Sequence, residues 1–237
     1  MCRPTEHPFL LQVMNAAAAR GITYFDCARS YGESEEFTAC WLFSRAEAAA
    51  KTNVGSKWGY EYTAGWRVQV SDGEAHEVKK HTIAQLRRQL GESLSLLPEP
   101  CLYQIRSAPI ESGVLENDEV LDALAALRDG KLIPGTGPIV PGLSVSHPQV
   151  PTIEKAIGLE RTGARLFGEV QATFNLLDQS ASSALALAHE AGMLVVVKEA
   201  LANGRLTSRA PPSTGLAVLR REAATLGVTE DALALAW

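Results

Sequence analysis

Long apolar runs and clusters of basic residues are both missing from this chain of 237 residues. No stretch approaches the roughly 20 apolar residues of a membrane-spanning helix, so we expect no membrane segment. Lys and Arg together number 22 against 27 Asp and Glu, which gives a formal net charge of −5. Nucleic acids and anionic membrane surfaces attract basic surfaces, so we expect neither as a main partner.

Cysteine is scarce and follows no metal-binding or disulfide pattern. Among Cys2, Cys27, Cys40 and Cys101, no two form a C-x-x-C pair, so we expect reduced thiols and no zinc site. The opening residues "MCRPTEHPFL" contain Pro, Glu and His where a signal peptide would need an apolar run. Together these features predict a cytoplasmic protein.

Two motifs of other enzyme classes are incomplete. The run "GTGPIVPG" contains G-x-G, but Pro138 and Pro141 prevent a helix from opening there, which argues against a phosphate-binding loop. The run "GLSVS" (142–146) resembles a nucleophile elbow but ends on serine instead of glycine. His76 and His81 are five residues apart, a spacing that does not place two ligands on one helical face. We therefore expect neither a serine hydrolase nor a metal site.

Short β-rich runs alternate with helical segments along the chain. Helical periodicity is clearest at 78–97. This alternation predicts a parallel sheet covered by helices, in one domain over residues 1–237. The expected strands are 22–26, 54–58, 102–105, 142–146, 169–175 and 194–200, and the other expected helices include 121–127, 185–188, 216–226 and a last one after Thr229.

Polar residues stand where the expected strands end. They are Asp26, Lys57 and Arg106 on the first three, Gln171 and Asn175 in the fifth, and Lys198 on the sixth. The carboxyl ends of parallel strands in a β/α barrel build the active site. The set therefore indicates a shared site, although strand ends also meet polar loops in any protein.

Asp26, Tyr31 and Lys57 predict a specific chemistry if they converge. A tyrosine hydroxyl titrates near 10 and is a poor acid at neutral pH, but a nearby ammonium favours the phenolate and lowers that pKa. A carboxylate paired with the lysine keeps the ammonium charged and oriented. Such a tyrosine can give a proton to a carbonyl oxygen while a hydride reaches the carbon.

Five runs resemble successive landmarks of the aldo-keto reductase superfamily: "GITYFDCARSYGESE", "GSKWGY", "LYQIRSAPIESGVL", "GLSVS" and "VQATFNLL". The resemblance implies a (β/α)8 TIM barrel that transfers hydride between NADPH and a small carbonyl compound without a G-x-G-x-x-G loop. It assigns catalysis to Asp26, Tyr31 and Lys57, and contact with the nicotinamide amide to Ser144 and Gln171. Asn175 and Lys198 are further candidates for cofactor binding, and NADH stays open as an alternative cofactor.

The chain departs from the family at one catalytic position and at both ends. Arg106 occupies the place of the family's histidine, and arginine only donates hydrogen bonds and stays charged. The first and last strands of the barrel are not evident, so we expect an incomplete barrel of about six of eight strands, able to self-associate through its open edges. The chain is accordingly either a reductase or a catalytically impaired, truncated member that serves as a nucleotide-binding or interaction module.

Four aromatic residues crowd the segment after Lys57, namely Trp58, Tyr60, Tyr62 and Trp66. Hydrophobic packing explains such a group in most proteins. The alternative is that these rings line the mouth of the barrel and stack on the substrate or the nicotinamide.

Overall fold

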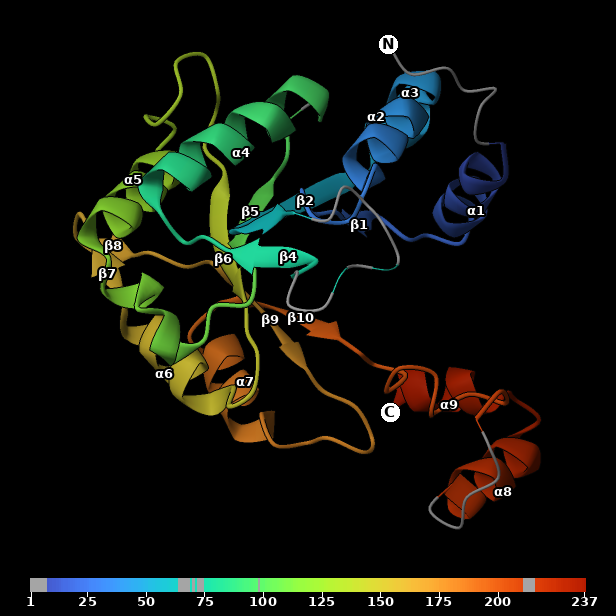
Figure 1. The fold of residues 1–237 in the computed structure, drawn as a ribbon. Coiled ribbons are helices and arrows are strands. Elements are labelled where there is room, and N and C mark those ends of the chain that lie inside the picture. The colour runs from blue at the N-terminus through green and yellow to red at the C-terminus, as the bar shows by residue number, and fades with distance from the viewer. Residues whose placement is uncertain (1–7, 64–68, 70, 72–74, 98, 211–215) are drawn as a thin grey trace.

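The structure is a computed structural model that describes residues 8–63, 69, 71, 75–97, 99–210 and 216–237. Its centre is a curled, six-stranded parallel sheet in the order β1-β2-β5-β6-β9-β10 (Figure 1). The prediction of a TIM-barrel type with about six strands is confirmed. The strands are β1 (Tyr24–Asp26), β2 (Asn53–Trp58), β5 (Leu102–Ile105), β6 (Val140–Ser144), β9 (Glu169–Thr173) and β10 (Leu194–Lys198).

Helices cover the outer face of this sheet (Figure 1). Leu86 and Leu90 of α4 (Ile83–Leu96) and Leu121 and Leu124 of α5 (Asp118–Arg128) are fully buried against strand residues such as Ile105. No helix within the described ranges combines the length and the apolar character needed to cross a membrane. The helices before the last two are α1 (Pro8–Ala19), α2 (Ser34–Ser44), α3 (Ala46–Ala49), α4 (Ile83–Leu96), η1 (Ile110–Ser112), η2 (Val114–Glu116), α5 (Asp118–Arg128), α6 (Val150–Gly158) and α7 (Ser182–Glu190).

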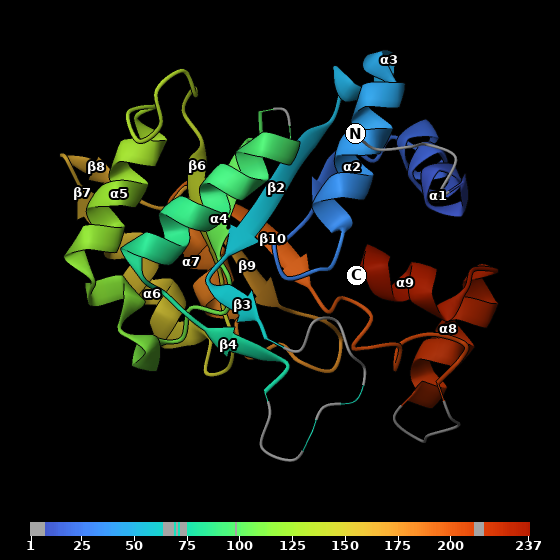
Figure 2. The ribbon, with the colours of Figure 1, turned by 45° about the horizontal axis from the view of Figure 1, so that its top comes forward.

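The predicted start of the helix at residue 78 is wrong, because residues 77–79 form a strand. The expected helix 78–97 begins only at Ile83, because Thr82 caps it and its hydroxyl accepts a hydrogen bond from the Gln85 amide at 3.3 Å. The preceding residues form β4 (Glu77–Lys79), which pairs antiparallel with β3 (Tyr60–Tyr62). Figure 2 shows this hairpin just beyond the end of β2. A second small hairpin joins β7 (Glu160–Arg161) and β8 (Ala164–Arg165).

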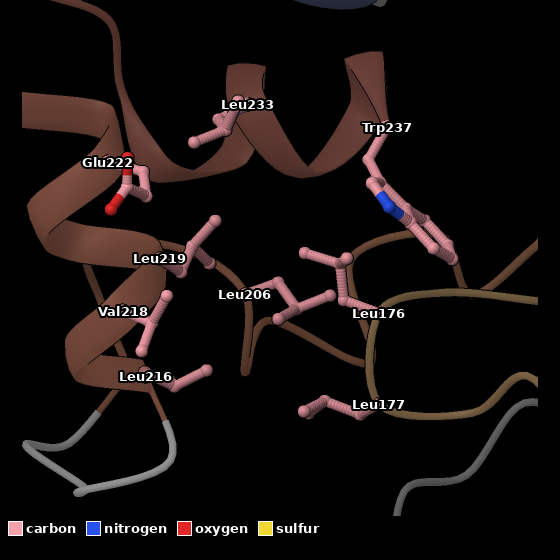
Figure 3. A pocket seen from close by; sticks show the side chains of 9 residues that line it. All are labelled: Leu176, Leu177, Leu206, Leu216, Val218, Leu219, Glu222, Leu233 and Trp237. Atoms are coloured by element: carbon pink, nitrogen blue, oxygen red, sulfur yellow. The ribbon is translucent and has the colours of Figure 1, made fainter. Parts of the chain in front are cut away.

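Two helices at the end of the chain line one side of an apolar cavity of about 400 Å³. They are α8 (Ala217–Leu226) and α9 (Glu230–Ala236), and Thr229 caps α9 as its position predicted, accepting from the Ala232 amide at 3.4 Å. Figure 3 shows leucines of this segment facing Leu176 and Leu177. Trp237 stacks on Phe174 with 5.5 Å between ring centroids, which fastens α9 to the loop after β9.

Two glycines make room inside the half-barrel. A Cβ at Gly55 would lie 2.2 Å from the Tyr24 hydroxyl, and one at Gly142 would lie 2.1 Å from Oε2 of Glu169. Both distances are far below any normal contact, so large side chains of β1 and β9 occupy the space that these glycines leave. In both places a large side chain therefore packs directly against the backbone of a glycine on another strand.

The cysteines only partly match the expectation of reduced thiols. Cys27 and Cys101 are free, whereas Cys40 is disulfide-bonded. Burial raises the pKa of the Cys27 thiol, because the thiolate would lose its hydration there. Cys27 therefore behaves as a packed, neutral side chain.

Candidate active site

Lys57 and Asp26 form an ion pair at the carboxyl ends of β2 and β1. The ammonium donates to Oδ2 of Asp26 and, at 3.1 Å, to the carbonyl oxygen of Cys27. The Lys57 side chain is fully buried, while that of Asp26 is 29% exposed. A buried ammonium keeps its charge only when it is paired, so Asp26 fixes both the charge and the direction of Lys57.

Tyr31 lies above this pair and beside a second cation. Nζ of Lys57 is 4.9 Å from the centroid of the Tyr31 ring, and Cζ of Arg106 is 5.2 Å from it. The ring is 44% exposed, so it remains accessible from solvent. The structure thus brings together Asp26, Tyr31, Lys57 and Arg106, the four residues predicted to be catalytic.

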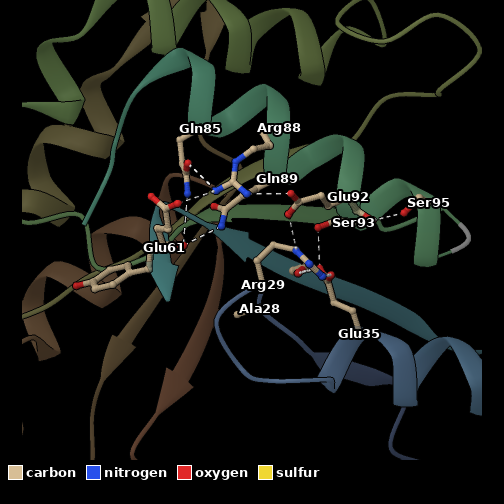
Figure 4. Close-up of polar contacts among 12 residues, drawn as sticks. Ala28, Arg29, Glu35, Glu61, Gln85, Arg88, Gln89, Glu92, Ser93 and Ser95 are labelled. Atoms are coloured by element: carbon tan, nitrogen blue, oxygen red, sulfur yellow. Dashed lines mark hydrogen bonds and ion pairs between the residues drawn. The ribbon is translucent and has the colours of Figure 1, made fainter. Parts of the chain in front are cut away.

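A buried polar network anchors the loop that carries Tyr31 (Figure 4). Arg29, two residues before Tyr31, forms ion pairs with Glu35 of α2 and Glu92 of α4. Glu35 is 1% exposed and also accepts hydrogen bonds from the hydroxyls of Ser56 and Ser93, the latter at 2.7 Å. The loop after β1 is therefore tied to β2 and α4 by charge-assisted hydrogen bonds.

Arg106 is held by the β3–β4 hairpin and by the loop after β1. Its guanidinium donates to Glu77 of β4 at 2.7 Å and to the hydroxyl of Ser30. It also stacks on Tyr60 of β3, with Cζ 4.5 Å from the ring centroid. The β3–β4 hairpin thus supplies an anion and an aromatic face that fix Arg106, and Asp26 stays paired with Lys57.

His81 supports the backbone at the same position. Its Nε2 donates to the carbonyl oxygen of Arg106 at 3.0 Å, and its ring packs edge-on against Trp58. Burial lowers the pKa of His81 to about 4, because the charged imidazolium would lose its hydration. His81 is therefore neutral at pH 7 and acts as a hydrogen-bond donor.

Ser144 and Gln171, expected at the nicotinamide, are neighbours on β6 and β9. They occupy the same register and are both about 4% exposed. The Gln171 amide donates to Oδ2 of Asp26 at 3.1 Å. This hydrogen bond crosses the interior from β9 to β1 and ties the expected cofactor side of the mouth to the ion pair.

Lys198 and Asn175 occupy different environments. Desolvation lowers the pKa of Lys198; Glu199 opposes this shift, and the charges of Arg106 and Lys57 add to it. Lys198 therefore lies close enough to Arg106 and Lys57 for their positive charges to act on it. The Asn175 side chain instead accepts from the Leu177 amide at 2.9 Å and donates to the carbonyl oxygen of Glu199 at 3.0 Å. It is occupied in bracing the loop after β9.

Of the aromatic residues after Lys57, one packs in the core and another lines the mouth of the barrel. Trp58 is 1% exposed and belongs to the core, which is the packing role. Tyr60 faces Arg106, and so lines the mouth. Trp66 lies outside the described residues.

Sequence reasoning did not single out four residues that shape the interior and the mouth: Ser30, Glu77, Tyr24 and Glu169. Glu169 is completely buried but left little signal, because the strand that it opens, "EVQAT", alternates polar and apolar residues throughout. Glu77 left none, since its role depends on a hairpin formed across more than ten residues. Among the described residues, no group of three or more His, Cys, Asp or Glu side chains could hold a metal ion.

Comparison with solved structures finds the same fold in aldo-keto reductases. The holo form of an aldo-keto reductase from Bacillus halodurans matches with a TM-score of 0.67 and 20% identity, over 89% of this chain and 66% of that one. A Pseudomonas aeruginosa protein assigned as an aldo-keto reductase matches with a TM-score of 0.61 and 26% identity, over 81% of this chain and 66% of that one. The chain thus spans slightly less than two thirds of the length of these neighbours.

A search of the curated proteins finds no match. The family model, in contrast, covers nearly the whole chain. The model described as the aldo/keto reductase family matches residues 3–237, in agreement with the half-barrel and with the sequence landmarks on β1, β2 and β9. The chain therefore belongs to the aldo/keto reductase family.

Proposed function

We propose that this protein is an NADPH-dependent oxidoreductase that reduces an aldehyde or a ketone, with Tyr31 as the proton donor. The observation that carries the proposal is the stack of Tyr31 over Lys57, with Asp26 paired beneath it. This arrangement supports proton transfer to a carbonyl oxygen, because a charged ammonium at the ring stabilises the phenolate that the transfer leaves behind.

Each residue of the group has a separate task in this reaction. Tyr31 gives its hydroxyl proton to the carbonyl oxygen. Lys57 stabilises the resulting phenolate, and Asp26 holds Lys57 in place. Arg106 points its guanidinium at the same mouth and polarises the carbonyl oxygen through its charge.

The chain offers cations and amides where a dinucleotide would lie. NADPH, when bound, supplies the hydride that reaches the carbonyl carbon. Ser144 and Gln171 would contact the nicotinamide amide, Lys198 would meet a negatively charged part of the cofactor, and Asn175 would hold the adjacent loop in shape. NADH is the alternative donor of the same hydride.

We further propose that residues 1–237 act as one domain in the cytoplasm. The outer edges of β1 and β10 end the sheet within the described part of the chain. Such edges favour pairing with another strand, so self-association belongs to this proposal.

One observation favours a second candidate function. Arg106 is bound to Glu77 and Ser30 and lies over Tyr31, so it occupies space beside the hydroxyl that a carbonyl substrate needs. The second candidate is a catalytically impaired member that binds the nucleotide and serves as a binding or interaction module.

Two measurements on the full chain separate these candidates. Stopped-flow absorbance of NADPH with a panel of aldehydes and ketones should show oxidation of the cofactor. Calorimetric titration with NADPH and NADH should show binding of at least one of them. Binding without oxidation of the cofactor would support the second candidate, and absence of both would overturn the two together.

A further inference from the structure

Arg106 uses only one nitrogen of its guanidinium within the described part of the chain. Its hydrogen bonds to Glu77, at 2.7 Å, and to the hydroxyl of Ser30 both start at Nη1. Nε and Nη2 form no hydrogen bond with any described residue, and neither atom is buried. These two nitrogens form one edge of the planar guanidinium, and their N–H groups point the same way as a fork of two donors.

Arg29 of the same chain shows how a guanidinium can hold two carboxylates. It bonds Glu35 through Nη1 and Glu92 through Nε, the latter at 3.2 Å (Figure 4). Arg106 likewise holds one carboxylate, that of Glu77, through Nη1. The nitrogen through which Arg29 binds its second carboxylate is unused in Arg106 within the described ranges. A second carboxylate could therefore bind there bidentately, through Nε and Nη2.

The guanidinium of Arg106 is held next to the proposed proton donor. Its Cζ lies 5.2 Å from the ring centroid of Tyr31 and 4.5 Å from that of Tyr60. His81 fixes the backbone of Arg106 by donating to its carbonyl oxygen at 3.0 Å. A substrate whose carbonyl oxygen reaches the Tyr31 hydroxyl would therefore place the next carbon atom near Arg106.

Two carboxylates near Arg106 are already engaged. Asp26 pairs with Lys57, and Glu77 pairs with Arg106 itself. Lys198, on which the charges of Arg106 and Lys57 act, forms no ion pair or hydrogen bond with any described residue. A substrate anion would therefore meet donors without partners on Arg106 and Lys198.

We propose that the carbonyl substrates of this site are 2-oxo acids, and that Nε and Nη2 of Arg106 bind their carboxylate. This inference rests on the function proposed above. C2 receives the hydride and Tyr31 gives its proton to the 2-oxo oxygen, so a 2-hydroxy acid forms as the nicotinamide is oxidised. Tyr31 regains its proton from solvent, and the carboxylate keeps its charge throughout. The guanidinium is an obstacle for a neutral aldehyde, but it orients a 2-oxo acid.

Pyruvate and methyl pyruvate, each given to the full chain with NADPH, test the proposal. The ester has the more electrophilic ketone, so intrinsic reactivity favours the ester. We expect kcat/KM to be at least about tenfold higher for pyruvate, which is about 1.4 kcal/mol. The acid-to-ester ratio should be close to one for 4-oxopentanoate, because its carboxylate lies two carbons further from the carbonyl. Equal ratios for the two pairs, or a preference for methyl pyruvate, would overturn the proposal.

Two variants of Arg106 locate the carboxylate. Arg106→Lys keeps the charge and loses the fork, so the acid-to-ester ratio for pyruvate should fall by at least about tenfold. Arg106→His also frees space beside Tyr31, so kcat/KM should fall for pyruvate while turnover of a neutral aldehyde such as hexanal rises. Arg88→Lys, on the exposed face of α4, is the matched control and should leave the ratio unchanged. Circular dichroism checks the fold, and a full pyruvate preference in folded Arg106→Lys would rule out the fork.

Binding without turnover separates this inference from the proposed function. An NMR titration of the full chain without cofactor follows the methyl signal of pyruvate. It should show saturable binding that is at least about tenfold weaker in Arg106→Lys. If hexanal is reduced but pyruvate is neither bound nor reduced, this inference falls and the proposed function stands. If no carbonyl compound is reduced, the proposed function falls; binding that is lost in Arg106→Lys would still support the carboxylate site, and absence of binding would overturn it.

Discussion

Nζ of Lys57 lies 4.9 Å from the ring centroid of Tyr31, and the same ammonium is bonded from below by Asp26. The tyrosine comes from the loop after β1 and the lysine from the end of β2, so their contact depends on two parallel strands in register. Asp26 pairs with Gly55, two residues before Lys57. Because side chains alternate along a strand, this register places Lys57 one step above Asp26 on the same face.

Tyr31→Phe should remove carbonyl reduction and leave cofactor binding unchanged. The variant keeps the ring that stacks with Lys57 and Arg106 and loses only the proton donor, so we expect kcat to fall by about 10²- to 10⁴-fold. Stopped-flow oxidation of NADPH measures the rate, and calorimetry measures the affinity. Tyr60→Phe is the matched control, because its ring stacks on Arg106 in the same way; a similar loss in both variants would argue against a special role for Tyr31.

Arg106→His should raise turnover by about tenfold or more. A neutral imidazole can donate or accept at the carbonyl and frees the space that the guanidinium takes beside Tyr31. Arg88→His, on the exposed face of α4, serves as the control and should leave turnover unchanged. Unchanged turnover in Arg106→His would mean that the guanidinium beside Tyr31 does not limit the reaction.

Glu35→Ala should destabilise the protein by about 1–3 kcal/mol, because it removes one of the two carboxylates that pair with Arg29 and the acceptor of the Ser56 and Ser93 hydroxyls. Urea unfolding monitored by circular dichroism gives the free energy. Glu36→Ala, the adjacent position in the first turn of α2, should change it by less than about 1 kcal/mol. A loss below 1 kcal/mol for Glu35→Ala would mean that the network does not hold the loop.

His81 predicts a loss of stability in mildly acidic solution. Its pKa is about 4 in the folded protein and about 6.5 when unfolded. Because the folded pKa is the lower one, the neutral His81 does not reduce the free energy of unfolding above pH 6.5. As the pH falls from 6.5 toward 4, the unfolded chain binds a proton that the folded protein does not, so the free energy of unfolding falls, by about 3 kcal/mol in full. Urea unfolding at pH 7 and pH 5 should show a smaller pH dependence for His81→Gln than for the unmodified chain; equal dependence would contradict the prediction.

Gly142→Ala should destabilise the protein by about 1–3 kcal/mol, since the new methyl group would enter the niche of the Glu169 carboxyl. In a Glu169→Ala background the same change should cost less, which a double-mutant cycle measures as non-additivity. Gly91→Ala in α4 is the control: no atom lies within 4 Å of the added Cβ, and alanine should stabilise this helix by up to about 1 kcal/mol. Additive losses would mean that Gly142 and Glu169 do not compete for the same space.

The strands and the core of the site could be predicted because their signals are local. "YFD" ends on Asp26 and "SKW" contains Lys57, which meet at the mouth, and six strand-like runs separated by helices give the sheet. The β3–β4 hairpin could not be predicted, because Val78 fits a helical pattern yet is 39% exposed on a strand. The partners of Arg106 follow from that hairpin, so they were equally hidden. Burial of Glu169 depends on the curl of the sheet, which no short stretch encodes.

The pairing of Tyr24 with Gly55 has a consequence for how this chain can diverge. A side chain at position 55 requires Tyr24 to leave the interior, and a smaller residue at position 24 opens a void that only a change at 55 can refill. Relatives should therefore carry these two positions as a correlated pair, glycine with tyrosine or a larger residue with a smaller one. Intermediates with only one change should be rare, because each of them is either overcrowded or hollow.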